Sequence, residues 1–244
     1  MGLRIATNVA SLNAQRAMSK TKEQIGENFA RLASGLRINK AADDAAGLAI
    51  SEKLRAQVRG LRQARRNAND GVSMIQVAEG ALQETGNILI RLRELSVQAA
   101  SDTIGETERA FTNKEFQQLK LEMERIAQMT NYNGTALLKG EGGVLDIQVG
   151  TNNDPFQDRI TYDTAVPVAT LAGLGMEAED ISTKIGSQTS LSVIDDAITK
   201  VNDYRSTMGA MQNRLQSTVN NLAITEENLS AANSRIRDTD IAHE

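Results

Sequence analysis

One apolar stripe with a helical period, running from Leu54 to Ala99, constrains this chain more than any other feature. Its members are three or four residues apart throughout: Leu54, Val58, Leu61, Ala64, Ala68, Val72, Ile75, Ala78, Leu82, Thr85, Leu89, Leu92, Leu95 and Ala99. The mean step is about 3.5 residues, which is the period of a left-handed coiled coil. A helix of about 55 residues rises about 80 Å, too long for the core of an ordinary globule. We therefore expect the stripe to be buried against other long helices.

Two further segments supply candidate partner helices. Residues 106–130 carry apolar side chains three and four residues apart, and the same period returns over residues 190–238. Between them, VLDIQVG alternates apolar and polar residues and RITYDT follows after a loop, which indicates a β-hairpin. Aromatic residues are only 3% of the chain, which suits thin helical packing better than one thick core. The predicted fold is mainly α: an elongated bundle of long coiled-coil-like helices with a small β-hairpin region.

The first segment carries an apolar stripe of its own, for which no partner helix is evident. We expect it to form an assembly interface, with its contacts made by Val9, Leu12, Ile25, Phe29 and Leu32.

The stretch SGLRINKAADDAAGLAI joins this segment to the long helix through small residues. Asp43 and Asp44 are N-cap residue types, and either carboxylate can accept hydrogen bonds from the first amides of the next helix. Their negative charge also suits the positive end of that helix.

The composition argues against an enzyme. The chain has no cysteine and a single histidine, His243, so neither a thiolate metal site nor a histidine-based triad is expected. The paired acids are better explained as helix caps and solvated faces. No phosphate loop of the GxxxxGK[ST] type and no run of about 18 apolar residues occurs. We expect no cofactor, no metal ion and no membrane span.

Positive charge is concentrated early in the chain. Residues 1–66 hold thirteen Lys and Arg against five Asp and Glu, although the whole chain has a net charge of −4. Such a bias is compatible with nucleic acid or an anionic membrane as partner. No aromatic stacking platform accompanies the charges. A solvated helix face or a contact between subunits explains them better, so we expect neither nucleic acid nor membrane as a partner.

Several stretches closely resemble the sequence signatures of bacterial flagellins. The longest is LASGLRINKAADDAAGLAISEKLRAQVRGLRQA, and it is followed by ANDGVSMIQVAEGALQE, ILIRLRELSVQAA and MTNYNG. Near the other end, SRIRDTDIA resembles the second signature of the family. The resemblance covers most of residues 1–150 and 190–242.

The resemblance implies a subunit that is exported without a cleaved signal and polymerises outside the cell into the flagellar filament. It divides the chain into an inner-tube helix and spoke (1–44), outer-layer helices (45–132), a small β-hairpin region with a short insertion (133–189), and a returning long helix with the start of a C-terminal arm (190–244). Asp43 and Asp44 belong to the spoke. Two alternatives stay open: a hook–filament junction protein, and a flagellin-derived receptor agonist that does not polymerise.

The partners implied by the resemblance are other flagellin subunits and an export chaperone that binds the C-terminal arm. The chain stops at Glu244, a few residues past SRIRDTDIA. We therefore expect most of that arm, with its chaperone-binding region, to lie beyond this sequence. We also expect residues 1–244 alone not to form stable filaments.

The resemblance also implies recognition by Toll-like receptor 5, the animal sensor of flagellin. In many family members the receptor binds the segment that resembles LIRLRELSVQ, which gives Arg91 and Leu95 here, with Glu115 from the facing helix. Arg91 and Leu95 are four residues apart and share a helix face. Leu95 also fits the core stripe, and it would lie at the surface only if Ser96 took its place there.

Overall fold

The computed structural model describes residues 8–242, and most of them are helical. The helices are α1 (Val9–Ser34), α2 (Ala45–Ala99), α3 (Glu106–Met129), the short α4 (Leu171–Leu174) and α5 (Lys184–Arg237). The strands are β1 (Asn131–Tyr132), β2 (Thr135–Ala136), β3 (Val144–Gln148) and β4 (Arg159–Asp163). The predicted fold class, mainly α with long helices and a small β region, is confirmed. His243 lies outside the described residues.

The chain forms two compact units. One unit consists of residues 63–223, and the other of residues up to 62 together with residues from 224 onward. Both α2 and α5 contribute residues to each unit. These units divide the chain differently from the four segments expected from the sequence, whose boundaries stay a prediction.

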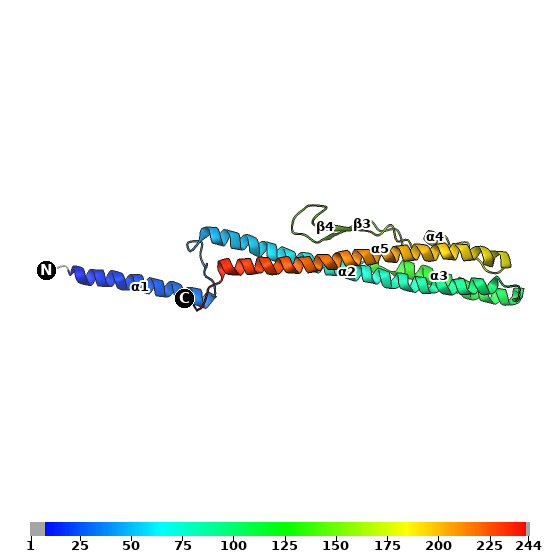
Figure 1. Ribbon diagram of the computed structural model, residues 1–244, viewed down its shortest axis with the longest axis horizontal. Coiled ribbons are helices and arrows are strands. Elements are labelled where there is room, and N and C mark those ends of the chain that lie inside the picture. The colour runs from blue at the N-terminus through cyan, green and yellow to red at the C-terminus, as the bar shows by residue number, and fades with distance from the viewer. Residues whose placement is uncertain (1–7, 243–244) are drawn as a thin grey trace. The chain divides into compact units, whose positions relative to one another are not determined.

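The unit of residues 63–223 has one apolar core, to which α2, α3 and α5 all contribute. The three helices lie side by side in this unit (Figure 1). Their largest buried side chains include Ile75, Leu82, Leu89, Leu92, Phe116, Met123, Ile194 and Met208. The apolar stripes of α2 and α5, each spaced at the helical period, therefore bury one another, as expected for long helices that pack along their length.

A buried arginine closes the junction between α2 and α3. The guanidinium of Arg109 donates from Nε to the carbonyl of Ala99 at 2.8 Å, and from Nη2 to the carbonyls of Ser101 and Ile104 at 3.2 Å each. The last carbonyls of a helix have no partner within it, and a cation there also complements the negative end of the helix. Arg109 thereby fixes where α2 stops and how the chain turns into α3.

The two small sheets are antiparallel hairpins. β1 and β2 are joined by Asn133 and Gly134, both with positive φ, as an Asn-Gly hairpin turn requires. β3 pairs with β4 from Val144↔Asp163 to Gln148↔Arg159. This hairpin approaches α2 closely at Gly71, where an added Cβ would stand 2.7 Å from Cδ1 of Ile147.

The segment between β4 and α5 carries more structure than its weak sequence pattern indicates. Thr170 caps α4 by accepting the amide of Gly173 at 3.3 Å. Thr183 accepts the amide of Gly186 at 3.0 Å, so α5 begins at Lys184 and not at residue 190 as predicted. In both cases a threonine at an N-cap position determines the start of the helix.

The other unit joins the end of α1 to the end of α5. Leu36 forms an isolated antiparallel bridge with Asp238, and the amide of Arg37 donates to the carbonyl of Arg237 at 2.7 Å. An ion pair of 2.6 Å links Arg62 on α2 to Glu226 on α5. This pair accounts for Glu226, a polar interruption in the apolar stripe of α5.

Candidate functional site

The apolar stripe of α1 lies in solvent in the isolated chain. No residue of this helix is buried, although its side chains include Val9, Leu12, Met18, Ile25, Phe29 and Leu32. Phe29 is 67% exposed. Ile25, Phe29 and Leu32 are spaced by four and three residues, so they share one face of the helix. An exposed apolar face of this kind indicates a contact with another chain.

The joint between α1 and α2, residues 35–44, is held by side chains that cap backbone groups. Gly35 ends α1 in the left-handed region with a φ of 68°, a conformation that favours glycine. The side-chain amide of Asn39 donates to the carbonyl of Ala30 at 3.2 Å and to Oγ of Ser34 at 2.7 Å. Together these groups fix the direction in which the chain leaves α1.

The two aspartates of the joint have different tasks. Oδ1 of Asp44 accepts the amide of Gly47 at 2.8 Å, which makes it the N-cap of α2. Oδ2 of Asp43 instead accepts the amides of Asn39 and Lys40, at 2.9 and 2.8 Å, and so closes the turn before the helix. Both hydrogen bonds hold the pKa of the Asp43 carboxyl below its ordinary value, and the bond from the Lys40 amide has the larger effect.

A glycine is required where the joint meets α2. A Cβ at Gly47 would stand 2.8 Å from Cγ of Asp44 and 2.8 Å from Cδ1 of Ile38. Ile38 is the buried apolar anchor of the joint. Gly47 therefore serves the packing of the joint on itself, whereas Ala41, Ala42, Ala45 and Ala46 are exposed.

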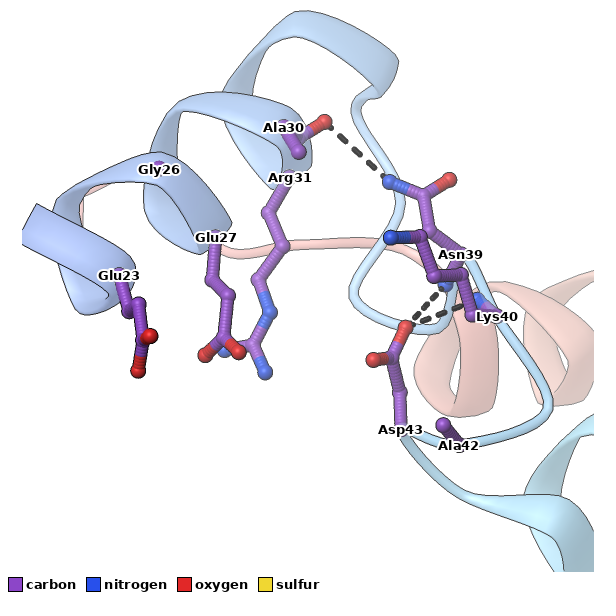
Figure 2. A pocket seen from close by; sticks show the side chains of 9 residues that line it. All are labelled: Glu23, Gly26, Glu27, Ala30, Arg31, Asn39, Lys40, Ala42 and Asp43. Atoms are coloured by element: carbon purple, nitrogen blue, oxygen red, sulfur yellow. Dashed lines mark hydrogen bonds between the residues drawn. The ribbon is translucent and has the colours of Figure 1, made fainter. Parts of the chain in front are cut away.

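A cavity of about 390 Å³ lies between the last turns of α1 and the joint. Figure 2 shows Glu23, Glu27 and Arg31 of α1 on one side and Asn39 and Asp43 of the joint on the other. Its walls carry charged side chains of both signs beside Gly26, Ala30 and Ala42. This mixture resembles the polar rim of an interface more than a ligand pocket.

A second group of charges joins α2 to α3. Arg91 donates from Nη2 and Nε to Oε1 of Glu115, at 2.8 and 3.0 Å, and from Nη1 to Oε2 of Glu94 at 2.9 Å. The side chains of Arg91 and Glu115 are each 49% exposed. These hydrogen bonds raise the pKa of Arg91 above its ordinary value, and the bond to Glu115 has a larger effect than the bond to Glu94. Arg91 and Glu115, which the resemblance puts together, are thus brought into contact at the surface.

Leu95 does not lie at this surface. It is 1% exposed, and Ser96 beside it is also buried, with its hydroxyl donating to the carbonyl of Leu92 at 2.9 Å. The expectation that Ser96 could release Leu95 to solvent is wrong. The physical reason is that this part of α2 has a wide buried face, which takes both neighbouring positions.

The structure also identifies positioning residues that the sequence did not. Arg109 and Arg37 both donate to backbone carbonyls at helix ends, the latter to Ile236 from Nε at 3.2 Å. The signal in the sequence was a basic residue close to each predicted helix end, but apolar periodicity does not reveal such residues.

Among residues 8–242 there is no group of three or more acidic or histidine side chains that could hold a metal ion. Within the same range, no helix is both long enough and apolar enough to cross a bilayer.

Comparison with known proteins gives two family matches. The bacterial flagellin N-terminal helical region matches residues 5–142, and the bacterial flagellin C-terminal helical region matches residues 191–244. The flagellin of Halalkalibacterium halodurans is 46% identical over 237 residues, which cover 97% of this chain and 86% of that protein. The flagellin of Bacillus subtilis is 40% identical over 275 residues, which cover 99% of this chain and 89% of that protein.

Solved structures agree with these matches. The crystal structure of Bacillus cereus flagellin is similar with a TM-score of 0.57 and 32% identity, over 69% of this chain and 94% of that chain. A proposed flagellar hook-associated protein from Vibrio parahaemolyticus gives a TM-score of 0.65 at 14% identity, over 80% of this chain and 100% of that chain. At that identity the second likeness concerns the fold alone.

Proposed function

The chain belongs to the bacterial flagellin family, and from this premise we propose that the protein polymerises with copies of itself into the extracellular flagellar filament. That residues 1–244 alone do not form stable filaments stays a prediction. The observation that carries the proposal is the uncovered apolar face of α1, with Ile25, Phe29 and Leu32 exposed on one side of the helix. Burial of such a face between neighbouring subunits would supply a large part of the free energy of assembly.

The alternative of a hook–filament junction protein is supported only by likeness of fold. The flagellin matches extend over both ends of the chain and reach 46% identity, which favours the filament. Binding of an export chaperone stays a prediction from the family resemblance.

The filament proposal is tested by replacing the flagellin gene of a motile bacterium with the full-length gene for this protein. Phe29→Asp puts a charge into the stripe, so we expect secretion of subunits without filaments by electron microscopy. Gln24→Asp, which adds one negative charge to α1 outside the stripe, is the matched control and should leave filaments intact. Normal filaments from Phe29→Asp would contradict the proposed role of this face.

We further propose that the Arg91–Glu115 pair is a contact site for Toll-like receptor 5. Support comes from its half-exposed position and from the two acids that hold the guanidinium plane of Arg91 in place. Arginine anchors of this kind are common at the centres of interfaces. Because Leu95 is buried, it would not touch the receptor. It would support the site only indirectly, by holding α2 in the core of the subunit.

A reporter assay with purified monomer tests the receptor proposal. Arg91→Ala and Glu115→Ala should each reduce signalling about tenfold or more while the circular dichroism spectrum stays unchanged. Arg93→Ala is the matched control, because Arg93 is similarly exposed on α2 but pairs with Asp195 of α5. If the Arg91 and Glu115 variants signal like the parent protein, the assignment is wrong.

A further inference from the structure

The loop between β3 and β4 presents an aromatic ring to solvent. Phe156 is 88% exposed, the highest value among the large apolar side chains that the structure describes. Figure 1 shows this loop at the end of the hairpin that points away from α4. A single exposed apolar side chain is common and does not by itself mark a contact. What distinguishes Phe156 is the fixed conformation of its loop, together with a cavity of matching size elsewhere in the same unit.

Two aspartates hold the loop in one conformation. Oδ1 of Asp154 accepts the amides of Phe156 and Gln157, at 2.8 and 3.1 Å. The carboxylate of Asp158, which is buried, accepts the amide of Asn152 at 3.3 Å and the amide of Asp154 at 3.0 Å. The backbone that carries Phe156 is thus ordered before any partner binds. Docking of its ring therefore costs little conformational entropy.

The cavity has the size of one aromatic ring. It has a volume of about 140 Å³ and lies between the end of β4, the turn that follows it and the middle of α5, within the unit of residues 63–223. Its lining is almost wholly apolar and includes Val166, Pro167, Tyr204, Met208 and Met211. An apolar cavity of about 150 Å³ in a protein is large enough to bind benzene. The cavity therefore has room for one phenyl ring.

The cavity extends inward from the surface of the unit. Val166 and Thr207 of its lining are exposed, whereas Met208 is buried and Tyr204 and Met211 are half-buried. Methionine side chains adapt to the shape of a neighbouring group and make favourable contacts with aromatic rings. The tyrosine ring can pack against a second ring in an offset or edge-to-face arrangement. The lining thus suits a phenyl group that enters from outside.

The ring of Phe156 cannot fill the cavity of its own chain. Phe156 lies beyond one end of β4, and the cavity lies at the other end. β4 pairs with β3 along its whole length, from Arg159 to Asp163, which separates its two ends by about 13 Å. The ring that fills the cavity must therefore come from another molecule.

We propose that the ring of Phe156 in one copy of this protein docks into the cavity of a second copy. The proposal rests on assembly into a filament, as proposed above, and assigns one of its contacts. A ring on one part of the surface that fits a cavity on another part makes a heterologous contact. Such contacts generate open helical polymers when successive copies do not close into a ring.

The area of the contact identifies its occupant as a second copy. Burial of one phenylalanine removes roughly 150–250 Å² from water, far below the roughly 1,200–2,000 Å² of a stable interface. The ring therefore stays bound only where further contacts hold the two molecules together. The exposed apolar face of α1 offers such contacts between copies of this chain.

Crosslinking in filaments of the full-length protein tests the contact. One copy carries Gln157→Cys, next to the ring, and another carries Thr207→Cys, at the rim of the cavity; residues 1–244 hold no cysteine of their own. A short bis-maleimide should join the two variants into a dimer when they assemble together, and neither variant alone should give a dimer. Leu121→Cys, exposed on α3, replaces Thr207→Cys in the control and should not be joined to Gln157→Cys.

Removal of the ring tests its contribution to assembly. Phe156→Ala leaves the hydrogen bonds of the loop in place, because these involve only backbone amides and the two aspartates. It should abolish the mixed crosslink and raise the subunit concentration needed for assembly about tenfold or more, the effect of losing one buried aromatic side chain. Thr151→Ala, exposed in the same loop, is the matched control and should assemble like the parent.

The cavity is tested separately in the isolated chain with toluene, which is the side chain of phenylalanine as a free molecule. The methionine methyl groups are labelled with 13C. Of the eight methionines, only Met208 and Met211 should shift saturably on addition of toluene, because only these two line the cavity.

The mixed crosslink, its loss with Phe156→Ala and the toluene shifts at Met208 and Met211 would together establish the contact. The contact alone is overturned if the parent forms filaments but the mixed crosslink is absent or appears equally with Leu121→Cys. It is also overturned if Phe156→Ala assembles like the parent, or if toluene leaves both methionines unchanged. Absence of filaments from the full-length parent would overturn the proposed function as well.

Discussion

Three glycines of α2 show where helix propensity and packing compete. Gly71 faces Ile147 of the β3–β4 hairpin, so its missing Cβ permits the close approach. Among the residues that the structure describes, none comes within 4 Å of a Cβ added at Gly80 or Gly86. Close packing within the subunit therefore explains the glycine at position 71 but not those at positions 80 and 86.

Replacement of Gly80 by alanine should stabilise the isolated chain by about 1 kcal/mol, which is the difference in helix propensity. Gly71→Ala is the matched variant and should gain less or lose stability, because Ile147 must move. Urea denaturation followed by circular dichroism compares the two. A larger gain for Gly71→Ala than for Gly80→Ala would contradict the account.

The joint before α2 should respond to acid through Asp43. Its two backbone hydrogen bonds need the carboxylate form and lower its folded pKa. The stabilisation is therefore fully present above the ordinary pKa of an aspartate, about 3.9, and is lost as the pH falls through the lower folded value.

The amide signals of Asn39 and Lys40, followed by NMR, should titrate with an apparent pKa below about 3.9. In Asp43→Asn this titration should disappear, because the amide side chain carries no proton that is lost in this range. A midpoint at or above about 3.9 in the parent protein would show that the turn does not depend on the carboxylate.

Helices and strands with a periodic apolar pattern could be predicted from the sequence. Helix ends that depend on a single side chain could not. The stripe from Leu54 to Ala99 predicts a helix of about 55 residues, and the structure has α2 at Ala45–Ala99, because apolar residues of one period extend through most of the helix. The strands β3 and β4 lie inside the alternating segments VLDIQVG and RITYDT. The start of α5 depends on a single N-cap residue, Thr183. One such residue is hard to recognise in a sequence, whereas a periodic pattern repeats over many positions.

Side-chain placement at the candidate site was predictable only in part. Arg91 and Glu115 lie on helices whose pairing follows from their stripes, so their contact could be expected. The burial of Leu95 depends on how wide a face of α2 is covered, and spacing along one helix does not fix that width. The three carbonyl contacts of Arg109 depend on the path of a loop, which has no periodic signal.

The α2–α3 junction should depend strongly on Arg109. Arg109→Ala removes three hydrogen bonds to carbonyls and leaves the end of α2 without its cation, so we expect a loss of about 2–4 kcal/mol in the free energy of unfolding. Lys114→Ala, on the exposed side of α3, should change it by less than about 0.5 kcal/mol. Equal denaturation curves for Arg109→Ala and the parent would contradict the anchoring role.

In the molecule as a whole, some apolar stripes are buried within the subunit and one is exposed. Residues 63–223 bury the stripes of α2, α3 and α5 in one core within the subunit. The stripe of α1 has no such cover within the described chain. A structural subunit needs both features: a part that is stable alone, and a part that gains its burial from neighbours.

If the protein assembles as we propose, the apolar face of α1 is exposed in the subunit and buried in the filament. The chain has no cysteine, so a single Phe29→Cys substitution supplies a unique reporter for a water-soluble maleimide. Labelling should be complete in the monomer and at least about tenfold slower in filaments of the full-length protein, as for a thiol removed from solvent. Asn153→Cys in the β3–β4 loop reports reagent access in the monomer. Equal labelling rates of Phe29→Cys in monomer and filament would contradict the account.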